Sequence, residues 1–253
     1  MASSRLEILN DGGLRHDARR PYELRSLSLE LSTHPNADGS STVSQGLTTV
    51  SASVFGPREP KQRAGSVHDK ASVVVEVGVA PWAGAREVRR TRGDKRLLEI
   101  AAAIRQTFEP VIMTHLYPRS EIAVHIQVIS ADGGILPTAI NATTLALVDA
   151  GISLIDYVTS LSLGLHLTQP LLDLSAPEEA DLPTLVVAAL PSGKVTLAQM
   201  ETRLHVDRFE EMLTLGVEGC GVLKTEMDRV VKDRTTRVVE RMDKVIQGRI
   251  TGD

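Results

Sequence analysis

The stretch Ile129-Ser-Ala-Asp-Gly-Gly-Ile-Leu-Pro137 joins the two clearest elements of this chain. Before it, residues 121–129 alternate between apolar and polar side chains, which predicts a strand. After it, residues 138–150 form an apolar run that ends at Gly151, which predicts a helix with a glycine C-cap. A strand that enters a helix through two glycines exposes backbone N–H groups at the positive end of the helix dipole, so it is a candidate anion site. Glycine pairs also serve as plain tight turns, and both interpretations stand at this point.

Strand and helix patterns continue on both sides of this junction. Period-2 or β-branched runs predict strands at 24–31, 47–55, 71–79, 157–167, 182–190 and 194–199. Apolar residues at spacings of three and four predict a helix over 96–109 and a long one from Val206 to about Val245, with Gly219–Gly221 as a potential break. Turn residues mark 33–41 and 57–70 as loops. This order of elements indicates a single α+β or α/β domain.

Composition describes a globular chain of 253 residues with 42% hydrophobic and 24% charged residues. A single cysteine, Cys220, excludes a disulfide scaffold and a cysteine-based zinc site. The seven histidines show no metal-binding spacing, so we expect no metal site and no cofactor. We see no secretory signal at the N-terminus and no apolar run of about 18 residues. These features predict a soluble protein of a reducing compartment.

The net charge of −4 is unevenly distributed. Residues 1–119 carry 17 Lys and Arg against 13 Asp and Glu, whereas residues 120–253 carry 11 against 19. A polyanion should therefore meet the first half of the chain through a local basic patch. Aromatic residues make up only 3% of the chain, which argues against rows of stacked bases on a single strand.

A basic stretch, Arg86–Arg96, leads directly into the helix predicted over 96–109. Cations are unfavourable at a helix N-terminus, so Lys95 and Arg96 destabilise this helix unless an anion binds beside them. This favours a role in contacting a phosphate backbone, and a solvated basic surface is the alternative.

An acidic group, Asp173, Glu178, Glu179 and Asp181, precedes the strand predicted at 182–190. Such carboxylates hold Mg²⁺ or act in acid–base chemistry in some proteins. An acidic solvated loop is the simpler interpretation.

Several motifs, in order along the chain, resemble those of RNase PH-type phosphorolytic exoribonucleases. They are Asp17–Arg25, Val54–Glu59, Arg96–Ile100, Tyr117–Ser120, Ala131–Gly134 and Leu145–Ile152. Each is weak alone, but together they span nearly the whole chain. Thr33–Pro35, Ala37–Ser41 and Leu171–Ser175 resemble more narrowly the ring subunits of the eukaryotic RNA exosome, in the lineage of the archaeal catalytic subunit.

The resemblance implies an α+β fold, a single RNase PH-like β-α sandwich domain over 1–253. Residues 1–15 would be an N-terminal extension and 246–253 a disordered tail. It also implies a ring of six related subunits, with RNA-binding cap subunits and a hydrolytic exoribonuclease as further partners, in the nucleus, nucleolus and cytoplasm, and no membrane.

The resemblance also implies a phosphate site, which this chain has altered. Active members follow the glycine pair (Gly133 and Gly134 here) with Thr or Ser and then Arg, whereas this chain has Ile135 and Leu136. The hydroxyl and the guanidinium that hold the attacking phosphate are therefore both absent.

Of the two family carboxylates, Asp181 matches the second, and the first falls at Ser175, although a shifted loop could bring Asp173 close. Arg96 matches the family's RNA-contacting arginine, with Lys95 beside it. We therefore expect a non-catalytic subunit that contacts single-stranded RNA through Lys95, Arg96, Lys61 and Arg63. The alternatives are an active phosphate-dependent exoribonuclease that uses Asp181, and a scaffold that never touches RNA.

Overall fold

The computed structural model describes residues 8–10, 12–60, 68–84 and 94–250, with residues 244–250 described by their backbone only. The elements in this part of the chain are β1 (Leu27–Leu31), β2 (Gly39–Gln45), β3 (Thr48–Arg58), β4 (Ser72–Val79), α1 (Lys95–Phe108), the 3₁₀ turn η2 (Thr114–Leu116), β5 (Glu121–Ser130), α2 (Ile135–Asp149), β6 (Thr159–His166), β7 (Gln169–Leu172), α3 (Ala176–Asp181), β8 (Thr184–Ala189), β9 (Val195–Met200) and α4 (Val206–Ile250). Mixed strands and helices confirm the α+β class.

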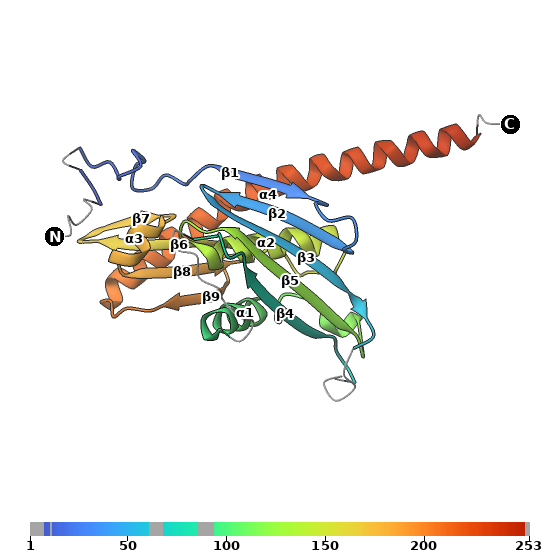
Figure 1. The fold of residues 1–253 in the computed structure, drawn as a ribbon, viewed down its shortest axis with the longest axis horizontal. Coiled ribbons are helices and arrows are strands. Elements are labelled where there is room, and N and C mark those ends of the chain that lie inside the picture. Colours follow the sequence, from blue (N-terminus) through green and yellow to red (C-terminus); the bar gives the residue numbers. More distant parts are fainter. Residues whose placement is uncertain (1–7, 11, 61–67, 85–93, 251–253) are drawn as a thin grey trace.

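The first sheet has five strands in the order β1-β2-β3-β5-β4 (Figure 1). Its neighbouring strands are antiparallel except β4 and β5, which run parallel because α1 connects them as a crossover. Side chains of β3 and β5 alternate between the two faces, and one face buries residues such as Val50, Val124 and Ile126 completely or almost so. Since β4 and β5 are parallel, their carboxyl ends lie at the same edge of the sheet.

The second sheet is antiparallel, in the order β7-β6-β8-β9, and α4 packs along β6 and β8. Helix α2 joins the two sheets, because it packs against β2 and β3 of the first and β6 of the second. Asn141 fixes α2 to β6, since its side chain donates to the Ser160 carbonyl (2.9 Å) and accepts from the Ser160 N–H (2.8 Å). A helix buried on all sides needs no polar face, which explains the run of apolar residues and threonines seen in the sequence.

Most predicted elements are confirmed within a few residues of their predicted bounds, but β2, β7, α3 and the 3₁₀ turn η2 were not predicted. Strand β2 begins at Gly39, inside the segment predicted as a loop, and β7 was not predicted. Three of the four acidic residues for which a solvated loop was the simpler interpretation lie in helix α3, namely Glu178, Glu179 and Asp181, and Glu178 is completely buried. The helix after the glycine pair begins at Ile135, three residues earlier than predicted.

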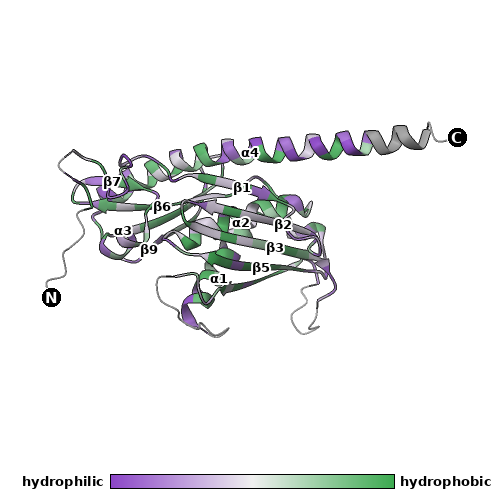
Figure 2. Cartoon of the chain, turned by 45° about the horizontal axis from the view of Figure 1, so that its top comes forward, coloured by the Kyte–Doolittle hydropathy of each residue, from purple (hydrophilic) through white to green (hydrophobic). Residues whose placement is uncertain are grey.

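Helix α4 runs unbroken from Val206 to Ile250, so the potential break at Gly219–Gly221 was wrong. Gly219 instead allows close packing, because a Cβ there would lie 2.7 Å from Leu161 Cδ1 of β6. The expected disordered tail was also wrong for 246–250, which continue α4. The helix extends beyond the body of the molecule, and hydrophilic residues dominate the coloured part of this extension (Figures 1 and 2).

Candidate functional site

The glycine turn (Asp132–Gly134) connects β5 to α2 with both glycines in the left-handed region, at φ 79° for Gly133 and 63° for Gly134. Thr48 secures the turn, because its hydroxyl donates to the Gly133 carbonyl (2.7 Å) and accepts from the Asp132 N–H (2.9 Å). Arg25 adds a hydrogen bond from Nη1 to the Asp132 carbonyl (2.8 Å). The turn is thus held in a fixed shape by β3 and by the segment before β1.

The N–H of Gly134, the residue that caps the start of α2, bonds a carboxylate of the chain itself. The Gly134 N–H donates to Glu179 Oε2 at 3.1 Å. Ile135 and Leu136, the first two helical residues, are half-buried and pack against the main hydrophobic core. The positive end of α2 therefore meets Glu179, and the two side chains that follow the glycines supply no polar group.

Glu179 was part of the acidic group noted in the sequence, but its contact with the glycine turn was not predicted. Desolvation of the carboxyl group by the surrounding protein raises the pKa of Glu179. This effect is larger than the lowering of the same pKa by the Gly134 N–H and by Arg25. The Ser175-x-x-Glu178 spacing is a capping-box signal that could have revealed α3, and the Ser175 N–H donates to Glu178 Oε2 at 2.9 Å. Nothing local in the sequence places Glu179 at Gly134.

Asp173 is fully engaged by Arg25. Its carboxylate accepts from Arg25 Nε (2.9 Å), Nη2 (2.7 Å) and the backbone N–H (2.8 Å), and its side chain is completely buried. The Arg25 guanidinium that binds Asp173 also bonds the Asp132 carbonyl, so Asp173 lies near the glycine turn, with its carboxylate engaged in anchoring the segment before β1. Its use as the first family carboxylate stays a prediction.

A second buried pair joins Arg15 to Glu178, both with fully buried side chains. Arg15 Nε donates to Glu178 Oε1 at 2.7 Å, Nη2 donates to Oε2, and Nη2 also reaches the Asp173 carbonyl (2.9 Å). Burial alone would raise the pKa of Glu178, but the bonds from Arg15 and the Ser175 N–H hold that pKa below its ordinary value. Arg15, the last residue of the expected N-terminal extension, therefore has a completely buried and paired side chain.

Asp181 ends α3 and is exposed, with no hydrogen bond or ion pair to any residue that the structure describes. No group of three or more His, Cys, Asp or Glu suited to a metal ion occurs among the described residues. The structure therefore places Glu179, and not Asp181, in contact with the glycine turn.

Lys95 and Arg96 occupy the exposed first turn of α1. Asp94 caps this helix and accepts from the Arg96 N–H at 3.1 Å, so an acid of the chain offsets part of the cost of the two cations. Their side chains form no ion pair with the part of the chain that the structure describes. Lys61, Arg63 and residues 85–93 of the basic stretch lie outside the described residues.

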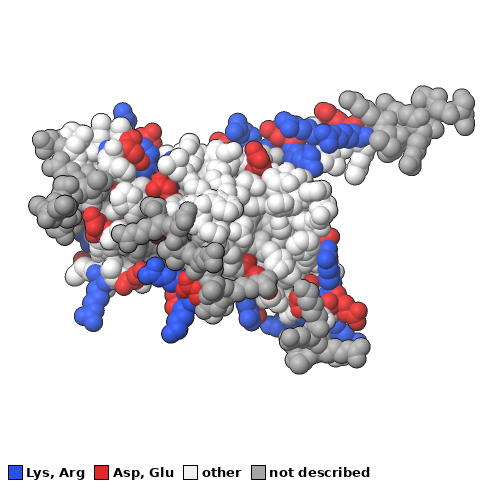
Figure 3. Space-filling model, in the orientation of Figure 1, with Lys and Arg blue, Asp and Glu red and all other residues white. Residues whose placement is uncertain are grey.

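The start of α1 and the glycine turn lie at the same edge of the first sheet. Leu97 lines a groove of about 440 Å³ together with Gly78 and Gln127, near the carboxyl ends of β4 and β5. The turn after β4 also touches the segment before the glycines, because the Ala131 N–H donates to the Ala83 carbonyl (2.7 Å). Figure 3 shows Lys and Arg side chains along the lower edge of its view, where α1 lies in Figure 1.

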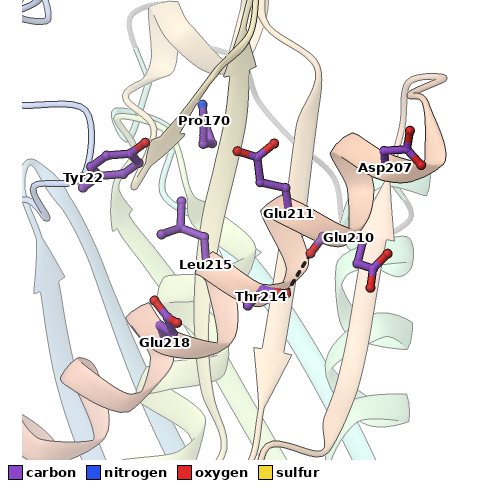
Figure 4. A pocket seen from close by; sticks show the side chains of 8 residues that line it. All are labelled: Tyr22, Pro170, Asp207, Glu210, Glu211, Thr214, Leu215 and Glu218. Carbon is purple, nitrogen blue, oxygen red and sulfur yellow. Dashed lines mark hydrogen bonds between the residues drawn. The ribbon is translucent and has the colours of Figure 1, made fainter.

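A different groove, of about 470 Å³, lies at the start of α4 and is acidic (Figure 4). Its charged lining consists of Asp207, Glu210, Glu211 and Glu218. Four carboxylates repel a phosphate backbone, so this groove is unsuited to RNA. This agrees with the acidic excess of the second half of the chain.

Comparisons with known proteins show the family of this chain. The family model described as "3' exoribonuclease family, domain 1" matches residues 23–153, and the one described as domain 2 matches residues 156–219. The human exosome complex component RRP41 is 40% identical over 230 residues, covering 90% of this chain and 94% of that protein. The Saccharomyces cerevisiae exosome complex component SKI6 is 36% identical over 239 residues, covering 93% and 97%.

Solved structures show the same fold. Rice (Oryza sativa) Rrp46 superimposes with a TM-score of 0.77 at 26% identity, covering 86% of this chain and all of that one. A chain of the Archaeoglobus fulgidus exosome with RNA bound to the active site gives a TM-score of 0.74 at 20% identity, covering 85% of this chain and 93% of that one.

Among the described residues, none of the helices combines the length and the apolar character that a membrane span requires. The two family models, the curated relatives and the shared fold establish that this chain belongs to the RNase PH-like 3′ exoribonuclease family.

Proposed function

We propose that this chain is a core-ring subunit of an RNA exosome that lines the central channel and performs no phosphorolysis itself. It guides the 3′ ends of single-stranded RNA to a separate hydrolytic ribonuclease, together with other RNase PH-like subunits and RNA-binding cap subunits, in the nucleus, nucleolus and cytoplasm. The names of the curated relatives, which are exosome components matched over nearly their full length, support the assembly.

The observation that carries the non-catalytic part is the environment of α2's first turn. Ile135 and Leu136 supply no hydroxyl and no guanidinium, and the Gly134 N–H is already paired with the Glu179 carboxylate. A free phosphate at this place would have to displace Glu179 or lie beside it. Two like charges that close repel each other, so the turn is poorly suited to binding an attacking phosphate.

Magnitudes support the loss of turnover. Phosphoryl transfer depends mainly on positioning and on stabilising charge, and one arginine at the transition state is worth about 10³–10⁵ in rate. Groups that act as a unit are not additive, so losing the arginine and the hydroxyl together should abolish nearly all phosphorolysis. Asp181 alone, exposed at the end of α3, does not replace them.

The RNA-guiding part rests on Lys95 and Arg96, which are exposed at the sheet edge that carries the glycine turn. We also assign phosphate contacts to Lys61 and Arg63. Contacts to phosphates carry no base information, so we expect RNA to pass without sequence preference.

The first test measures phosphorolysis by the assembled ring without added nuclease. The ring is incubated with labelled RNA and inorganic phosphate, beside an active phosphorolytic member of the family as positive control. We expect no nucleoside diphosphates above background. Diphosphates that disappear in an Asp181→Asn ring would instead establish the active-enzyme alternative.

The second test measures the salt dependence of RNA binding by the ring. A Lys95→Gln/Arg96→Gln variant should reduce the slope of log affinity against log salt by about 1.4, since each contact on a single strand contributes about 0.7. The matched control, Lys232→Gln/Arg237→Gln on exposed positions of α4, should leave the slope unchanged. An unchanged slope in the first variant would reject the assignment of Lys95 and Arg96, and an absence of RNA contact with this chain would favour the scaffold alternative.

A further inference from the structure

Trp82 is the only tryptophan of the chain and its most exposed aromatic residue, at 71% of its full exposure. Single exposed apolar residues are common on protein surfaces, so exposure alone assigns no role. The position of Trp82 is more informative, because it lies on the turn between β4 and the basic stretch.

Backbone hydrogen bonds hold this turn in place on both sides of Trp82. The Ala80 N–H donates to the Val128 carbonyl of β5 (2.9 Å), and the Ala83 N–H donates to the Ala80 carbonyl (3.0 Å). The Ala83 carbonyl in turn accepts from the Ala131 N–H at 2.7 Å. Ala80 and Ala83 are buried, so the backbone of the turn is packed while the indole between them faces solvent.

The last of these hydrogen bonds joins Ala83, the residue after Trp82, to Ala131, which directly precedes the glycine turn Asp132–Gly134. The first turn of α1, with Lys95 and Arg96, lies at this edge of the sheet as well. An RNA strand that follows this edge from Lys95 and Arg96 to the glycine turn passes the turn that carries Trp82. Phosphate contacts fix the path of a strand but leave its bases free, whereas an aromatic face binds one base of any identity.

We propose that Trp82 is a stacking platform for one unpaired base of the RNA that passes the glycine turn. The inference rests on the proposed function and adds to it a specific base contact. A single platform is consistent with the scarcity of aromatic residues, which excludes only a row of stacked bases.

A protein neighbour is the competing occupant of this surface. A stable protein interface needs a contiguous apolar area, but within the described residues of the turn the exposed neighbours of Trp82 are Pro81 and Gly84, which add little. Two cations at the same edge suit a polyanion better. The RNA base is therefore the occupant that the surroundings favour.

The test uses the assembled ring, with this chain alone labelled with 5-fluorotryptophan before reconstitution. Because the chain has one tryptophan, the fluorine spectrum contains one resonance, that of Trp82. We expect this resonance to be unchanged by assembly and to shift when oligoadenylate is added. Trp82→Ala should weaken oligoadenylate binding about 5- to 150-fold, and Trp82→Phe should retain most of the affinity. The salt slope should not change in either variant, since no phosphate contact is lost.

A matched control is Leu167→Ala, which removes an exposed apolar side chain (85% exposed) at the β6–β7 turn and should leave binding unchanged. A resonance that shifts on assembly and not with RNA would show a protein neighbour and overturn the inference. If the salt slope of RNA binding depends on Lys95 and Arg96 but Trp82→Ala leaves the affinity for oligoadenylate unchanged, the inference about Trp82 fails and the proposed function stands. If the ring binds no RNA through this chain, the proposed function fails with it.

Discussion

Replacing Glu178 by alanine tests the buried ion pair between Arg15 of the N-terminal segment and Glu178 of α3. In the parent chain, Glu178 and Arg15 form a two-pronged ion pair with both side chains fully buried. Without the carboxylate, the Arg15 guanidinium retains its bonds to the Leu172 and Asp173 carbonyls but loses its counter-charge in a site closed to water. The variant therefore leaves an uncompensated buried charge, which is much more costly than a lost surface contact.

Breaking a buried pair in this way costs about 3–5 kcal/mol. A chain of this length loses about 2–4 °C in Tm for each kcal/mol, so the expected fall in Tm is about 6–20 °C. The matched control is Glu226→Ala on α4, which breaks an exposed pair with Arg229 (side chains 47% and 71% exposed). Exposed pairs contribute about 0–1 kcal/mol, so the control should shift the Tm by no more than about 4 °C.

The assay is thermal unfolding of the full-length chain followed by circular dichroism. A double variant, Arg15→Met/Glu178→Leu, removes both charges together and should recover most of the lost stability, since apolar replacements of buried pairs are often neutral. The prediction would be refuted if Glu178→Ala melted within about 3 °C of the parent, or if the double variant melted no higher than Glu178→Ala. Either result would show that Arg15 and Glu178 are not a buried ion pair closed to water.

Three further predictions concern pH, packing and thiol chemistry. Arg15 lowers the pKa of Glu178 in the folded chain. The stabilisation that the Glu178 carboxylate contributes is therefore present above the ordinary carboxyl pKa and is lost as pH falls through the lowered, folded-state pKa. Between about pH 5 and 3, the urea midpoint should fall more for the parent than for Glu178→Ala. Gly221→Ala should stabilise α4 by about 0.5–1 kcal/mol, because the added methyl group enters open space. Gly219→Ala should destabilise α4, because its methyl group would lie 2.7 Å from a leucine of β6. A higher urea midpoint for both variants would contradict this packing. Burial raises the pKa of the Cys220 thiol to about 11, so Ellman's reagent at pH 8 should react only on unfolding, and fast labelling of the native chain would refute this.

The sequence alone determined the elements that carry a local signal. The strands β3, β4 and β5 and the helix α1 follow period-2 or period-3.6 patterns, and each was predicted to within about three residues. The glycine pair and the apolar residues Ile135 and Leu136 after it were readable in the same way, because turn chemistry depends on the residues in the turn. The charge difference between the halves was likewise a property of composition.

Strand β2 was missed because its residues, Gly39-Ser-Ser-Thr, have the composition of a turn. In the fold these small residues lie against α2, where a Cβ on Gly39 would be 2.2 Å from the Ala150 nitrogen. Ser41 is buried and its hydroxyl donates to the Ala142 carbonyl of α2 at 2.6 Å. Glycine and serine are present there because a helix packs closely, and that helix lies about a hundred residues further along the chain.

Only the tertiary structure decided how the acids are used. Glu179 lies 45 residues from Gly134, Asp173 lies 148 from Arg25, and Glu178 lies 163 from Arg15. Local periodicity reports which face of an element is buried, but it carries no information about which charge meets which partner once the two sheets close around α2. Ion pairs of buried groups form wherever folding removes both partners from water, and that is a property of the packed chain and not of any segment of it.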